Sequence, residues 1–128
     1  KLLADDFPNT LIILNHAGLP YDRSKEGLRD WRNEMNVISK CPNVVVKISG
    51  IGVPNLTWNK SNNEDVINYL IDKFGADRCM FGSNFPVDSL CASYDQIVET
   101  LFECISGLNN TEIENIFYNN AIKFYKPL

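Results

Sequence analysis

The fold of this chain is decided by the stretch RCMFGSNFPVD at residues 78–88. It opens with a short apolar run, residues 79–81, and continues into a cluster of Gly, Ser, Asn and Pro. A short apolar run that is bounded by turn residues predicts a buried strand. The polar residues that follow it lie where α/β folds place their chemistry, at the carboxyl ends of the strands.

Two further apolar runs, residues 10–14 and 44–48, precede this stretch. Helical patterns fill residues 24–40, 63–74, 94–106 and the segment from 111 onward. This alternation predicts an α/β fold with parallel strands and crossover helices. Three strands make a thin sheet with exposed outer edges, so we expect the strands to continue a larger sheet. A weaker alternative is a small doubly wound binding domain, which would require a reversal in the strand order.

Composition and charge restrict the class of protein. The chain has 128 residues and a net charge of −4, which predicts one domain over residues 1–128 and no nucleic-acid or acidic-membrane partner. No apolar run approaches the length of a membrane span. The four cysteines form no C-x-x-C pair, so we expect buried reduced thiols and a cytoplasmic location. The chain begins without Met, which predicts a fragment of a longer protein.

Two polar residues stand out near the first two strands. His16 is the only histidine and follows the run at 10–14; it is either a polar loop residue or a metal ligand or general base. Lys47 interrupts the apolar run at 44–48, where an unpaired buried charge is costly. It is expected either to pair with a carboxylate or to bind an anionic group of a substrate.

Three more candidates follow the third strand. Asn84 can orient a water molecule or a carbonyl group, but an amide cannot take up a proton. Asp88 is interpreted first as a turn or helix-capping residue. Nucleophilic chemistry at Ser83 is weakly supported, because the chain has no second histidine to form a triad with His16.

The segments NHAGLP at 15–20, NVVVKISG at 43–50 and RCMFGSNFPV at 78–87 together resemble a known family. They are similar to the C-terminal half of the amidohydrolase-related TIM barrels, in particular the lactonase-like branch with its sugar-lactone and pyrone-dicarboxylate lactonases. The resemblance implies strands six to eight of a (β/α)8 barrel. It also implies a hydrolase that acts on a lactone or a similar cyclic ester or amide, and therefore a small-molecule substrate.

The resemblance also implies roles for individual residues. His16 and Asn84 would be catalytic, His16 would also bind a divalent metal such as zinc if one is used, and Lys47, Asn15 and Ser83 would bind substrate. Asn84 stands where the family usually has an aspartate that activates water, which leaves the general base open.

The family's H-x-H pair and its first five strands are absent from this sequence. We therefore expect the isolated chain to be inactive, and its protein partner to be either the missing N-terminal half or a second copy of the chain in a homo-oligomer. The alternative function is a non-catalytic half-barrel that binds a partner or self-associates.

Overall fold

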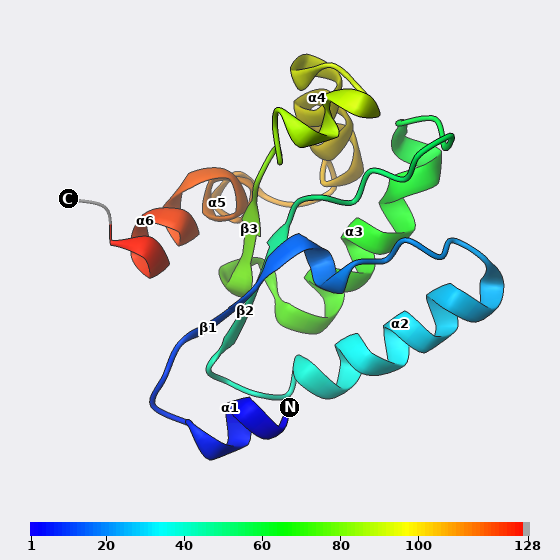
Figure 1. Ribbon diagram of the computed structural model, residues 1–128. Helices are drawn as coiled ribbons and strands as arrows, with labels where there is room; N and C mark the ends of the chain where they lie inside the picture. Colours follow the sequence, from blue (N-terminus) through cyan, green and yellow to red (C-terminus); the bar gives the residue numbers. More distant parts are fainter. Residues whose placement is uncertain (127–128) are drawn as a thin grey trace.

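The centre of the molecule is a parallel sheet of three strands, shown in Figure 1. The computed structural model describes residues 1–126. Strand β1 is Ile12–Leu14, β2 is Val44–Ile48 and β3 is Cys79–Phe81, all within the predicted ranges. They lie side by side in the order β1-β2-β3, with both pairings parallel. This order has no reversal, so the doubly wound alternative is wrong.

The register of the strands separates two faces of the sheet. Ile12 is opposite Val44, and Val46 is opposite Cys79. Paired residues point to the same face of the sheet, and every second residue along a strand does so too. The face packed against the helices carries Ile12, Leu14, Val44, Val46, Ile48, Cys79 and Phe81. The opposite face carries Ile13, Val45, Lys47 and Met80. Lys47 therefore does not enter the helix-packed core.

Helices connect the strands and cover that core. Helix α2, Lys25–Ile38, leads from β1 to β2, and α3, Lys60–Phe74, leads from β2 to β3. Helix α4, Tyr94–Cys104, follows β3 and packs against α3. Helix α5, Asn110–Glu114, a π-helical turn at Asn115–Asn119 and α6, Asn120–Tyr125, complete the chain beyond β3 (Figure 1). No helix within residues 1–126 is both long enough and apolar enough to cross a membrane.

Two helix starts differ from the prediction. The sequence suggested a start at Asn63, but Asn59 caps α3 by accepting a hydrogen bond from the Asn62 backbone N–H at 2.9 Å. Asn63 lies inside the helix and is buried. Likewise the helix expected from residue 111 onward begins at Asn110 and is capped by Asn109. The cause is the same in both places, because several neighbouring residues are competent caps and only the path of the chain selects one.

Arg78 joins the strands to the helices at the amino end of the sheet. Its guanidinium donates four hydrogen bonds of 2.9–3.1 Å to backbone carbonyl groups. The acceptors are the oxygens of Ser39, Cys41, Val44 and Phe74. These residues belong to the connection between α2 and β2, to β2 itself and to the end of α3, so one side chain satisfies polar groups from three segments.

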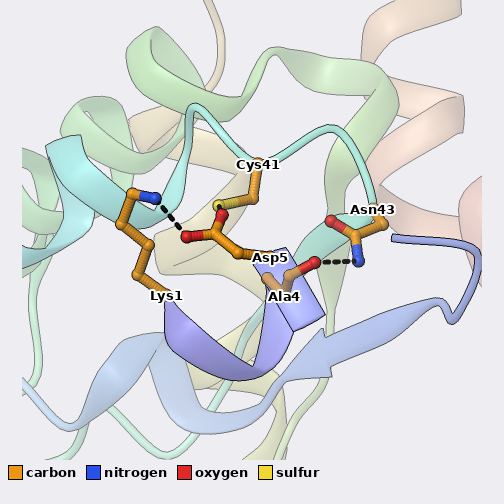
Figure 2. Close-up of polar contacts among 5 residues, drawn as sticks. All are labelled: Lys1, Ala4, Asp5, Cys41 and Asn43. Atoms are coloured by element: carbon orange, nitrogen blue, oxygen red, sulfur yellow. Dashed lines mark hydrogen bonds and ion pairs between the residues drawn. The ribbon is translucent and has the colours of Figure 1, made fainter. Parts of the chain in front are cut away.

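The short helix α1, Leu2–Asp6, is held on the loop before β2 (Figure 2). The side-chain amide of Asn43 donates to the Ala4 carbonyl at 3.1 Å. Asp5 forms an ion pair with Lys1, and its other oxygen lies 4.0 Å from the Cys41 sulfur. These contacts fix the entry of the chain into β1.

The cysteines are unpaired in the part of the chain that the structure describes. Cys41, Cys79 and Cys104 are buried and Cys91 is half-buried, and all four are free thiols. Burial raises the pKa of the Cys79 thiol to about 12, so it stays protonated at neutral pH. The expected buried, reduced thiols are therefore found at three of the four positions.

We expect Arg78→Met to lower the free energy of unfolding by roughly 2–4 kcal/mol, because four carbonyl groups lose a charged donor. Arg29→Met is the matched control, since Arg29 is exposed and pairs only with its neighbour Asp30. The free energy of unfolding of Arg29→Met should fall by about 0.5 kcal/mol or less. Urea denaturation monitored by circular dichroism measures both, and equal losses would contradict the role assigned to Arg78.

Candidate active site

The turn that follows β1 places His16 at the carboxyl edge of the sheet. His16 and Ala17 both have left-handed backbone angles, with φ of 54° and 52°. This conformation costs a non-glycine residue roughly 1–2 kcal/mol. The turn is held by the Trp31 indole, which donates to the Ala17 carbonyl at 2.8 Å, and by the Leu19 N–H, which donates to the His16 carbonyl at 2.7 Å.

The His16 ring is held by the residues that follow β2. Its Nδ1 lies 3.1 Å from Ser49 Oγ, and Ser49 is only 3% exposed. A Cβ atom at Gly50 would lie 2.8 Å from His16 Cγ and closer still to Nδ1, so the ring needs a glycine there. In either tautomer this contact engages Nδ1 and leaves Nε2 as the nitrogen that can meet a ligand.

Lys47 extends from β2 across β3. A Cβ atom at Gly82 would lie 2.7 Å from Lys47 Cε and 3.1 Å from Ser49 Cβ, so Gly82 gives both side chains room. The Lys47 ammonium lies 5.8 Å from the centre of the Tyr125 ring. No carboxylate within residues 1–126 forms an ion pair with it. The ion pair with a carboxylate, which was one of the two expectations for Lys47, is therefore not formed within residues 1–126.

Asn84 and Asp88 are linked by two hydrogen bonds in the loop after β3. Asn84 has a left-handed backbone with φ of 53°, and its Nδ2 donates to Asp88 Oδ1 at 2.9 Å. The Asp88 backbone N–H donates back to the Asn84 carbonyl at 3.1 Å. Asp88 lies in the turn Val87–Leu90, as predicted, but its side chain is buried rather than exposed.

Ser83 and Asn15 lie at the same end of the sheet without joining the other candidates. Ser83 Oγ accepts a hydrogen bond from the Phe85 backbone N–H at 3.2 Å, so it stabilises its own turn. Asn15 is exposed at the start of the turn after β1. Within residues 1–126 neither side chain has a hydrogen bond to another candidate, and their substrate-binding role stays a prediction.

Two hollows bear on where a ligand could sit. One of about 360 Å³ lies at the carboxyl end of the sheet, and its lining comes from the loops after all three strands, including Tyr21, Pro54 and Asp88. Another of about 920 Å³ lies at the opposite end, beside Ala76–Arg78 and the start of α5. His16 and Lys47 line neither of these two.

The donor atoms in the described residues do not make a metal site by themselves. Residues 1–126 hold no group of three or more His, Cys, Asp or Glu side chains able to bind a metal ion. A zinc site normally takes three or four such ligands. His16 could supply one imidazole, and a zinc ion with three or four such ligands would need at least one of them from outside residues 1–126.

Sequence reasoning missed three residues of this face, namely Ser49, Gly50 and Gly82. The available signal was the spacing of two between Lys47 and Ser49, which places both side chains on the same side of β2. Their contacts with His16 and β3 depend on the register between strands, which the sequence pattern does not contain.

Sequential parallel strands, outer helices and polar residues gathered at the carboxyl edge are the arrangement found in part of a (β/α)8 barrel. The family model described as Amidohydrolase matches residues 2–126, and the chain belongs to this family. The fold class and the resemblance inferred from the motifs are thereby confirmed.

Curated relatives agree with this assignment. The uncharacterized protein y4mH of Sinorhizobium fredii is 40% identical over 124 residues, which cover 97% of this chain and 41% of the relative. The L-fucono-1,5-lactonase of Burkholderia multivorans is 35% identical over 97 residues, covering 67% of this chain and 32% of the relative. The chain thus spans less than half the length of these two relatives.

Solved structures confirm the fold. A crystal structure of an amidohydrolase from Burkholderia multivorans with bound HEPES has a TM-score of 0.87 and 26% identity, covering 99% of this chain and 48% of that one. A second crystal form with bound zinc gives the same values. Amidohydrolase 2 from Bifidobacterium longum subsp. infantis has a TM-score of 0.69 at 23% identity, over 97% of this chain and 44% of that one, and supports the fold alone.

Gly50→Ala should displace the His16 ring and destabilise the chain more than Gly107→Ala. Gly50 has φ of 55° and its Cβ would meet the His16 ring, whereas a Cβ at Gly107 meets nothing within 4 Å. We expect a loss of about 2–4 kcal/mol in the free energy of unfolding for Gly50→Ala and about 1 kcal/mol or less for Gly107→Ala. Urea denaturation measures the two losses and the ¹³C shift of the His16 ring reports its displacement. An unchanged ring signal in Gly50→Ala would refute the role of Gly50 in holding the ring.

Proposed function

We propose that this chain carries part of the active site of a hydrolase that acts on sugar lactones or similar cyclic esters. The observation that carries the proposal is the His16 ring, which Ser49 and Gly50 hold at the carboxyl edge of the sheet with Nε2 free for a ligand. The name of the Burkholderia multivorans relative, an L-fucono-1,5-lactonase, supports the choice of substrate class.

Hydrolysis of a lactone requires water to attack the ring carbonyl. The water oxygen bonds to the carbonyl carbon, the ring C–O bond breaks, and the released alkoxide takes a proton. His16 Nε2 can polarise the carbonyl or accept the proton of the water. Asn84 can orient the water or a substrate hydroxyl, and Lys47 can bind an anionic group. A divalent metal, where one is bound, would supply Lewis acidity at the carbonyl.

The remaining part of the barrel would complete this site. The outer edges of β1 and β3 pair with no strand within residues 1–126. A full barrel takes about 250 residues. We therefore propose that a polypeptide segment with the other strands pairs with these edges, and that the chain without it turns over little substrate.

A second candidate function is a half-barrel that binds a partner without catalysis. Exposed apolar side chains on the helices favour it, since Leu2 is 81% exposed and Tyr118 63%. The same side chains would be covered when a barrel is completed. Sedimentation of the isolated chain separates the two, because a compact monomer that does not self-associate would count against a self-associating half-barrel.

The proposed compartment is the cytoplasm. All four cysteines are free within the described part of the chain, which suits a reducing environment.

A panel of lactones tests the proposed activity. The chain alone and the completed barrel, meaning the chain supplied with a segment that carries the other strands, are assayed with neutral and carboxylated lactones. We expect turnover only in the completed barrel. Equal activity in both preparations would refute the incompleteness of the chain, and no activity in either would refute the lactonase proposal.

Lys47→Met in the completed barrel should raise KM for a carboxylated lactone by about tenfold to a hundredfold, because a charge-assisted hydrogen bond is lost. KM for a neutral lactone should change by less than about twofold. Lys73→Met is the control, since Lys73 lies on α3 and pairs with Asp72. Equal increases for both lactones would exclude Lys47 as an anion-binding residue.

A further inference from the structure

We propose that Asp88 is a positioning residue, whose carboxylate fixes the Asn84 amide so that Asn84 Oδ1 is presented as a hydrogen-bond acceptor to the attacking water or a substrate hydroxyl. The inference rests on the proposed hydrolytic function. It adds Asp88 to the candidate site, whereas the family resemblance implied no role for this residue.

The chemistry of the pair dictates the orientation of the amide. An ionised carboxylate only accepts hydrogen bonds, so the group facing Asp88 Oδ1 at 2.9 Å must be the NH2 of Asn84. Because the amide is planar, its oxygen then points away from Asp88. The backbone hydrogen bond from Asp88 to Asn84 closes the same turn and limits the movement of both residues.

The burial of Asp88 argues that the carboxylate does more than stabilise a turn. Asp88 is 6% exposed, and its Oδ2 is buried without a hydrogen-bond partner among residues 1–126. No Lys or Arg of the described chain forms an ion pair with it. A buried carboxylate in this state is costly, and an asparagine could accept the same hydrogen bond without the charge.

An asparagine at position 88 would, however, lose orientational specificity. Its own amide could either accept from Asn84 or donate to it, so both orientations of Asn84 would be populated. The carboxylate permits only one. A hydrogen bond to a charged acceptor also polarises the Asn84 amide and strengthens its oxygen as an acceptor.

Three variants of the completed barrel test the pair. Asp88→Asn should unfold no more easily than the native protein, because a buried charge is removed, yet its kcat/KM should fall by about tenfold. Asn84→Asp places two carboxylates together and should lower the unfolding midpoint. The double exchange Asn84→Asp with Asp88→Asn restores one donor and one acceptor, so its unfolding midpoint should recover relative to that of Asn84→Asp. Asp6→Asn, an exposed carboxylate at the end of α1, is the control and should change neither value.

Two kinetic or stability results would overturn the inference. One is a loss of stability in Asp88→Asn that accompanies its loss of kcat/KM, which would indicate a purely structural role. The other is a double exchange whose unfolding midpoint is no higher than that of Asn84→Asp, which would mean that the two positions are not coupled.

A further measurement separates this inference from the proposed function. Exchange of the Asn84 side-chain amide protons with water, followed by ¹⁵N NMR on the 128-residue chain, does not depend on turnover. The amide should be protected in the native chain and exposed in Asp88→Ala. Protection without lactone hydrolysis in the completed barrel would refute the proposed substrate while retaining the fixed amide, and an unprotected native amide would refute the positioning role itself.

Discussion

The parallel pairing of β2 with both neighbouring strands determines where each polar side chain of this chain can act. Because the three strands run in the same direction, the segments after them meet at one edge, which brings His16 to Ser49 and Lys47 to Gly82. Alternation along β2 then separates Val44 and Val46, which pack on the helices, from Val45 and Lys47 on the other face. A shift of register by one residue would move the lysine into the helix-packed core, so the pairing and the chemistry depend on each other.

Much of this architecture could be predicted from the sequence. The runs at 44–48 and 79–81 coincide with β2 and β3, since short apolar segments between turn residues have few alternatives in an α/β chain. The helix starts could not be fixed in the same way. In an asparagine-rich segment Asn59 and Asn63 are equally good caps, and the choice is made by the path of the loop and by the burial of Asn63. Local preference therefore predicts that a helix begins, but not at which residue.

The candidate site also contains residues that the sequence can predict and residues that it cannot. His16, Lys47 and Asn84 can be identified from the sequence because each is polar at or near a strand end. The groups that hold them cannot, since Ser49 reaches His16 only through a left-handed turn and the register between β1 and β2. Asp88 was correctly expected in a turn, yet the burial of its carboxylate depends on how that turn folds against the loops of the other strands.

His16 and Asn84 are held in the structure in the same way. Each has left-handed backbone angles, which are unfavourable for a residue other than glycine. Each side chain is also held by a hydrogen bond to a second side chain, His16 to Ser49 and Asn84 to Asp88. All of these restraints come from residues of this chain. In the structure both side chains are therefore oriented by hydrogen bonds from the same chain. Under the proposed function, the rest of a barrel would add ligands and enclosure to a face on which these two side chains are already held.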